Sequence, residues 1–207
     1  MTATPTPVTV WIDPSCPWAW QGAKWLRHLA ADGHVVLEWH LFSLEVNAVR
    51  EMDPDAPLDF WSAAERHGTS LVSLQLALHE STAAFESLYE AIGVRLHERK
   101  QEPSADLVRA AATETGMTGI LDRALARPHI AEEVVREYSQ ARERDVFGVP
   151  SLSIDGSKVV YGPLVARAPE GADALELWQH TRWLAERTDF FELKRWPRDV
   201  RPGALAS

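Results

Sequence analysis

The chain has a single cysteine, Cys16, among its 207 residues. One cysteine cannot form an intramolecular disulfide, which excludes a disulfide framework and a thiolate-rich zinc site and fits a reducing compartment. Residues 1–7 also lack the basic start and apolar core of a signal peptide. We therefore expect a cytoplasmic protein, in which Cys16 works alone or with a thiol from another molecule.

Positive charge and long apolar runs are scarce as well. The chain has 21 Lys and Arg residues against 30 Asp and Glu, a formal net charge of -9, which argues against nucleic acid as a partner. No apolar run is long enough to cross a bilayer, so we expect no membrane partner. The GxGxxG, GxxxxGK[ST], GxSxG and HExxH patterns are missing and the histidines are scattered, so we expect no metal site.

Hydrophobic residues make up 45% of the chain, enough for one sizeable core or a domain with a large insertion. Nine tryptophans are many for this length. Large rings usually fill a core, and we expect that of most of them. Trp18, two residues after the cysteine, is the expected exception. His40 is expected to be a structural histidine rather than the lining of a pocket.

The N-terminal residues predict a strand, a helix and a second strand. Alternating apolar residues indicate a strand over 8–12, which Asp13 and the following proline end. Pro17 suits the first position of a helix, because its missing N–H would be unpaired there. Asp32 and the glycine after it end that helix, and alternation returns over 35–42. The first 45 residues therefore form a βαβ unit.

The rest of the chain predicts a helical block followed by a hairpin and a last helix. Alternation disappears over 46–146, where we expect four to six helices, one of them capped by Ser104. Strands at 151–154 and 158–161 flank Asp155-Gly156, a dipeptide favoured in two-residue hairpin turns. A helix over 173–187 follows. This order is that of an α/β, thioredoxin-like fold. The predicted domains are a thioredoxin-like domain, 1–45 with 147–207, and an all-helical insertion, 46–146.

Cys16 is predicted to lie at the start of the first helix. Unpaired N–H groups and the helix dipole favour the thiolate there, so we expect an exposed nucleophile with a lowered pKa. The alternative is a buried, inert cysteine. Val149-Pro150 opens the third strand and, in this fold, would face the cysteine as a cis-proline loop that leaves the preceding backbone free for substrate. The alternative is an ordinary trans-proline on an edge strand.

Three segments carry a resemblance to a known family: 11–20 (WIDPSCPWAW), 88–97 (LYEAIGVRLH) and 177–195. In this order they resemble the DsbA-like mycothiol-dependent nitroreductase family, and the similarity runs nearly end to end. The resemblance implies a thioredoxin fold whose helical insertion covers the active site. It also implies a cytosolic setting and reduction of small electrophiles, such as nitro compounds or disulfides, with mycothiol as electron donor.

The same resemblance implies roles for particular residues. Cys16 would be the nucleophile within the motif Cys16-Pro17-Trp18-Ala19. His97 matches a histidine of the family's helical segment that faces the pocket, and Asn47 occupies a loop near it. Characterised members carry a CPWC pair, and Ala19 replaces the second cysteine here, so an intramolecular disulfide cycle is excluded.

Three functions remain open from the sequence. The first is a monothiol oxidoreductase in which Cys16 forms a mixed disulfide that a small thiol resolves. The second is a transferase or isomerase, similar to kappa-class transferases and hydroxychromene-carboxylate isomerases, in which a bound thiol cofactor supplies the nucleophile. The third is a binding module without turnover. The oligomeric state is not determined, and a homodimer is compatible with the sequence.

Overall fold

A four-stranded sheet joins the two ends of the chain. The computed structural model describes residues 4–57, 60, 67–195 and 202–203. The sheet has the order β2-β1-β3-β4. β1 (Thr6–Ile12) pairs in parallel with β2 (Val35–Leu41) and antiparallel with β3 (Ser151–Ile154), and β3 pairs antiparallel with β4 (Val160–Tyr161). This mixed sheet is the predicted thioredoxin-like arrangement, and the prediction is confirmed.

The βαβ unit forms as its sequence predicts. The crossover from β1 to β2 is α1 (Pro17–Ala31), whose proline is at the first turn. The helix ends at Asp32, and Gly33 continues with a φ of +76°, a conformation that glycine adopts without strain. In β2 the odd-numbered positions are buried, as the alternation requires.

Helices form the middle of the described chain. They are α2 (Leu44–Met52), α4 (Gly68–Glu80), α5 (Thr82–Gly93), a π-helical turn η1 (Val94–Glu98), α6 (Ala105–Glu114), α7 (Ile120–Leu125) and α8 (Pro128–Glu143). α2 begins before the predicted residue 46, because Ser43 Oγ accepts a hydrogen bond from Val46 N at 3.2 Å and caps the helix. Ser104 caps α6 as predicted, accepting from Leu107 N at 3.1 Å.

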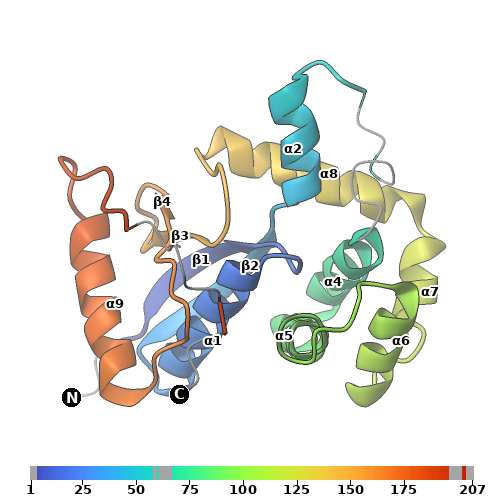
Figure 1. Cartoon of the computed structure of the whole chain (residues 1–207), viewed down its shortest axis with the longest axis horizontal. Coiled ribbons are helices and arrows are strands. Elements are labelled where there is room, and N and C mark those ends of the chain that lie inside the picture. The colour runs from blue at the N-terminus through green and yellow to red at the C-terminus, as the bar shows by residue number, and fades with distance from the viewer. Residues whose placement is uncertain (1–3, 58–59, 61–66, 196–201, 204–207) are drawn as a thin grey trace.

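The chain then returns to the sheet. Asp155 and Gly156 have φ values of 51° and 71°, as the predicted two-residue turn requires. β4 is shorter than predicted, starting at Val160 rather than residue 158. The last helix, α9 (Gly171–Ala185), starts and ends two residues earlier than predicted. Figure 1 shows the sheet between α9 on one side and helices α4 to α8 on the other. The division into domains at residues 45 and 147 stays a prediction.

Large rings fill the core around β1, α1 and α5, as expected of the tryptophans. Trp11, Trp20 and Trp25 are fully buried. Tyr89 of α5 packs edge-on against Trp20, with ring centroids 5.6 Å apart. Trp18 is half-buried and differs from these three, as predicted.

Candidate functional site: a single thiol at the start of a helix

The structure places Cys16 at the N-cap of α1. Its Sγ accepts a hydrogen bond from Ala19 N at 3.4 Å, so the sulfur takes the place that a serine or aspartate oxygen takes in other caps. Its own N–H donates to the carbonyl of Asp13 at 3.0 Å and closes the turn after β1. The predicted position of the cysteine is therefore observed. The expectation of an exposed nucleophile was wrong, because the residue is only 8% exposed.

Burial also reverses the expected shift in acidity. Removal of the thiol from water raises the pKa of Cys16 above the ordinary cysteine value, since the thiolate loses more solvation than the thiol. Hydrogen bonds from the backbone N–H groups of Ala19 and Trp18 lower the pKa by less, and the nearby charge of Asp13 raises it further. The position of Cys16 at a helix N-terminus predicts a lowered pKa. The sequence does not show that the thiol is buried, and burial has the larger effect on its pKa.

The loop at Val149 faces the thiol. Cys16 Sγ donates a hydrogen bond to the carbonyl oxygen of Val149 at 3.7 Å, across 133 positions of sequence. The peptide bond between Val149 and Pro150 is cis. The Pro150 ring packs behind α1, where a Cβ on Gly22 would lie 3.1 Å from Pro150 Cγ. Glycine at this position lets the loop approach the helix that carries the cysteine.

Asp13 is a part of the site that the sequence reasoning treated only as a strand terminator. It is 1% exposed, and its two carboxylate oxygens accept hydrogen bonds from Ser15 N and Leu44 N, each at 2.7 Å. One side chain thus fixes both the cysteine loop and the start of α2. An aspartate that directly follows a buried strand and precedes a helix-capping cysteine was the available signal.

His97 lies beside the cysteine loop. Its Nε2 is 2.9 Å from the carbonyl oxygen of Pro14, and its ring stacks on Trp20 with centroids 6.1 Å apart. Burial lowers the pKa of His97, so the neutral ring donates from Nε2 to that carbonyl. The residue sits on the π-helical turn η1, a distortion that is frequent at functional sites. It therefore contacts the chain two residues before the thiol.

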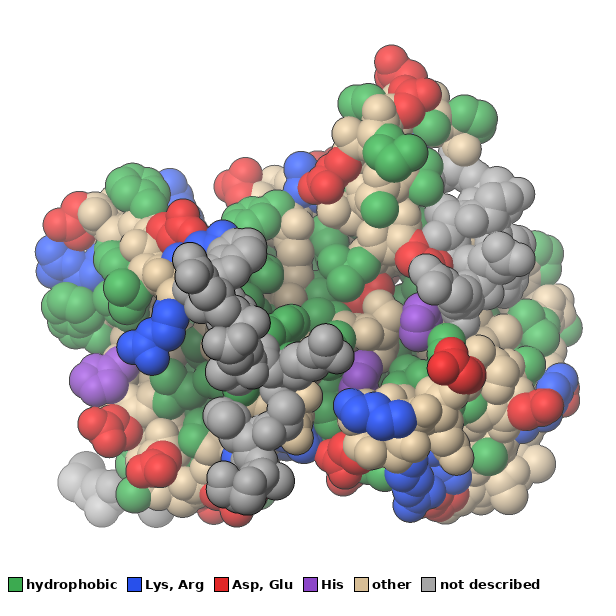
Figure 2. All heavy atoms as spheres, viewed as in Figure 1, with side chains coloured by type: hydrophobic (Ala, Val, Ile, Leu, Met, Phe, Trp, Pro, Cys, Tyr) green, Lys and Arg blue, Asp and Glu red, His purple; other side chains and the backbone are tan. Residues whose placement is uncertain are grey.

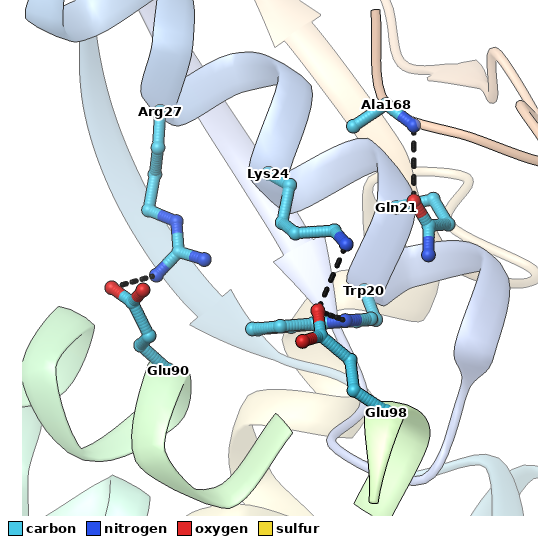
Figure 3. Close-up of polar contacts among 7 residues, drawn as sticks. All are labelled: Trp20, Gln21, Lys24, Arg27, Glu90, Glu98 and Ala168. Carbon is cyan, nitrogen blue, oxygen red and sulfur yellow. Dashed lines mark hydrogen bonds and ion pairs between the residues drawn. The ribbon is translucent and has the colours of Figure 1, made fainter. Parts of the chain in front are cut away.

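Polar contacts hold that turn against α1 (Figure 3). Glu98 accepts hydrogen bonds from Trp20 Nε1 at 3.3 Å and from Lys24 Nζ at 3.0 Å. One turn further along α1, Arg27 pairs with Glu90 of α5 at 3.1 Å. These contacts fix the helix that carries His97 relative to the helix that carries the cysteine.

The remaining predicted residues are placed differently. Pro17 and Trp18 are half-buried, whereas Ala19 is completely buried, so its methyl group faces the interior. Asn47 is buried on α2, and its Oδ1 accepts a hydrogen bond from the hydroxyl of Tyr138 on α8 at 3.3 Å. The contacts described for Asn47 therefore join α2 to α8 and do not include the thiol.

A cavity of about 540 Å³ lies between β2, α4 and α8, and its lining does not include Cys16 or the Val149 loop. His40 lines it and also makes a hydrogen bond through Nδ1 to Glu137 at 3.0 Å, while stacking on Trp11. That hydrogen bond raises the pKa of His40. His40 is thus both a bonded histidine and part of a cavity wall.

Within 4–57, 60, 67–195 and 202–203, no three or more His, Cys, Asp or Glu side chains are grouped so that they could hold a metal ion. None of the helices in the same part of the chain is long and apolar enough to span a membrane.

Comparisons with known proteins agree with this geometry. A protein of Mycobacterium tuberculosis, uncharacterized protein Rv2286c, is 31% identical over 194 residues, which cover 92% of this chain and 82% of the relative. A 2-hydroxychromene-2-carboxylate isomerase has a similar structure, with a TM-score of 0.58 and 14% identity over 86% of this chain and 94% of that one. A probable DsbA oxidoreductase, SCO1869 from Streptomyces coelicolor, has a TM-score of 0.56 and 22% identity over 92% and 94%.

These two solved structures share the fold of the chain. The model of one protein family, described as mycothiol-dependent nitroreductase Rv2466c, matches residues 15–195, a segment that includes the cysteine, the π-helical turn and the Val149 loop. The chain therefore belongs to the Rv2466c-like family.

Proposed function

We propose that the protein is a monothiol oxidoreductase in which Cys16 reduces small disulfides or nitro compounds together with a low-molecular-weight thiol of the mycothiol type. The observation that carries this proposal is the setting of the sulfur. Cys16 Sγ lies between a helix N–H, from Ala19 at 3.4 Å, and a carbonyl, from Val149 at 3.7 Å. Family membership supports the same class of chemistry.

The two backbone contacts support different protonation states of the sulfur. A thiol donates to the Val149 carbonyl, and a thiolate accepts from the Ala19 N–H. Because burial raises the pKa of Cys16, the resting group is the thiol. Attack therefore requires loss of this proton to solvent, after which the Ala19 N–H stabilises the anion. A thiolate with a high pKa is a strong nucleophile but is present in a small fraction.

With a disulfide as acceptor, the thiolate attacks one sulfur. The acceptor's S–S bond breaks, a bond forms between Cys16 Sγ and the attacked sulfur, and the leaving thiolate takes a proton from solvent. Because Ala19 replaces the second cysteine of the family motif, the chain cannot resolve this mixed disulfide itself. A bound small thiol would supply the second sulfur, which attacks the mixed disulfide and returns Cys16 to the thiol. With a nitro acceptor, Cys16 and the bound small thiol give up two electrons and two protons, which reduce the nitro group to nitroso and water. Their sulfurs are left joined as a mixed disulfide, which a second small thiol then resolves.

The residues around the sulfur fit a small thiol. The sulfur is flanked by a backbone donor and a backbone acceptor, and Cys16 as a residue is 8% exposed. Asp13 joins the loop before the cysteine to the start of α2 by accepting a hydrogen bond from Leu44 N. His97 holds the same loop through the Pro14 carbonyl. We propose that Val149 and Pro150 form the wall against which thiol and acceptor bind, with Trp18 beside them. Asn47 is proposed to support that wall indirectly, through Tyr138.

Intact-mass analysis tests the proposal. After incubation with oxidised mycothiol or oxidised glutathione, we expect one adduct per chain, which free thiol then removes. The Cys16→Ser variant should form no adduct and should lose turnover. Absence of an adduct on the wild-type protein would exclude this mechanism. Because one cysteine competes with no other thiol in the chain, the mass alone identifies the site.

The similarity to the isomerase structure favours a second candidate. In a thiol-cofactor-dependent isomerase or transferase, the cofactor's sulfur would be the nucleophile and Cys16 would only line its site. The Cys16→Ser variant would then keep much of its activity, whereas the monothiol mechanism requires that activity disappear. A cytoplasmic setting, expected from the single cysteine, is part of the proposal for either function.

A further inference from the structure

Two large aromatic side chains are exposed beside the loop that contacts the thiol. Phe147 is 58% exposed and Tyr161 is 45% exposed, although nearby apolar residues such as Val149 are buried. The two rings pack on each other with centroids 5.1 Å apart and an interplanar angle of 35°. Figure 2 shows hydrophobic side chains at the surface where the chain runs from α8 towards β3.

This aromatic pair is held by residues next to the one that contacts the sulfur. Gly148 lies under Tyr161, because a Cβ at that position would be 3.0 Å from Tyr161 Cε2. Tyr161 is also paired with Ser151 across β3 and β4. The residue between Gly148 and Pro150 is Val149, whose carbonyl accepts the hydrogen bond from Cys16 Sγ. The segment that contacts the thiol through Val149 therefore also contacts the Tyr161 ring through Gly148.

A charge interaction between Tyr161 and Cys16 also indicates that the ring pair lies near the thiol. Partial burial raises the pKa of Tyr161, and the charge that Cys16 carries as a thiolate raises it further. The phenol therefore stays neutral while the thiolate forms. The neutral phenol and the Phe147 ring it packs on together expose two uncharged aromatic faces. Such a surface suits an uncharged, flat, apolar group rather than an ion.

We propose, on the basis of the thiol exchange proposed for Cys16, that Phe147 and Tyr161 bind the aromatic ring of the acceptor. The preferred substrates are then small aromatic disulfides and nitroaromatics, and aliphatic acceptors of the same charge react more slowly. The ring would pack on the aromatic pair while its reactive atom meets Cys16 Sγ beside the Val149 loop. The covalent step is the exchange already described, with the aromatic thiolate as leaving group.

Two neutral disulfides test the preference. The rate of formation of the Cys16 mixed disulfide is measured by intact mass with 2,2′-dithiodipyridine, which is aromatic, and with bis(2-hydroxyethyl) disulfide, which is aliphatic. For Phe147→Leu and Tyr161→Leu, we expect the rate with the aromatic reagent to fall roughly 2- to 10-fold, as for loss of one aromatic pair, while the aliphatic rate stays at its wild-type value. Tyr161→Phe keeps the ring and should keep the rate.

Leu125→Ala is the matched control, since it removes an exposed apolar side chain from α7, on the opposite side of the molecule from β4 in Figure 1. It should change neither rate. Equal losses with both reagents in Phe147→Leu, or no loss with either, would overturn the inference.

A second measurement separates this inference from the proposed function. Binding of nitrobenzene to the Cys16→Ser protein, followed by saturation-transfer NMR, needs no thiol chemistry. We expect a signal that Phe147→Leu weakens and Leu125→Ala does not. If the wild-type chain forms no adduct while nitrobenzene binding depends on Phe147, the thiol mechanism is wrong and the ring site stands. If adducts form but nitrobenzene binding is absent or independent of Phe147, the ring site is wrong and the thiol mechanism stands.

Discussion

Replacement of Asp13 by asparagine should destabilise the protein and make its thiol more acidic. The side chain is buried and accepts two backbone hydrogen bonds of 2.7 Å, from Ser15 and Leu44. Asparagine keeps one acceptor oxygen and presents an NH₂ group to the other backbone N–H. One bond to a charged acceptor is lost, and a buried donor is left without a partner.

Loss of a hydrogen bond to a charged group costs about 1.5–3 kcal/mol, and the unsatisfied donor adds to this cost. We therefore expect Asp13→Asn to lower the free energy of unfolding by about 2–4 kcal/mol. For a chain of this size the corresponding fall in Tm is roughly 5–15 °C. Urea unfolding followed by tryptophan fluorescence measures the loss, and most of a typical stability of 5–15 kcal/mol would remain.

The same variant tests the electrostatics of the site. Because the charge of Asp13 raises the pKa of Cys16, its removal should lower that pKa, seen as a shift of the pH profile of iodoacetamide alkylation to lower pH. Asp32→Asn, at the exposed opposite end of α1, is the control and should change neither property. Wild-type stability in Asp13→Asn, or a thiol pKa that rises, would refute the reasoning.

Three further predictions concern the thiol, the core and a histidine. In the wild-type protein, alkylation of Cys16 should reach half its maximal rate above the ordinary cysteine pKa of about 8.5, and a midpoint at or below that value would contradict the burial argument. Gly93→Ala should lower the free energy of unfolding by about 1–3 kcal/mol, because the new Cβ would lie 2.4 Å from Trp20 Cε3; unchanged urea unfolding would show that the ring can move. The Glu137 hydrogen bond raises the pKa of His40, so its stabilising effect is complete below the unfolded histidine value of about 6.5 and is lost as pH rises through the folded value. Glu137→Gln should therefore cost more stability at about pH 5 than at about pH 8 in urea titrations, and an equal cost at both would count against this coupling.

The fold could be predicted from local patterns. The strand over β1, the helix beginning at Pro17, the cap at Ser104 and the turn at Asp155-Gly156 each depend on residues within a few positions of one another. Alternation, helix caps and turn residues act locally, so they remain visible in one dimension. Their order was sufficient for the thioredoxin-like arrangement.

The chemistry of the site depended on residues distant in sequence. The hydrogen bond of Cys16 to Val149 spans 133 positions, and that of His97 to Pro14 spans 83. Asn47 was expected near the pocket, but its described partner is Tyr138, which lies 91 positions away on another helix. Sequence spacing carries no information about which of these groups meet, because packing of helices on the sheet decides it.

The sequence by itself determined that one thiol would cap a helix and that Ala19 would leave it without a resolving partner. Only the tertiary structure decided how acidic this thiol is. A helix N-terminus favours the thiolate through a few N–H groups, whereas burial removes the water that would solvate the whole charge, and in this site burial has the larger effect. The position of the reactive atom is thus a local property, and its protonation is a property of the fold.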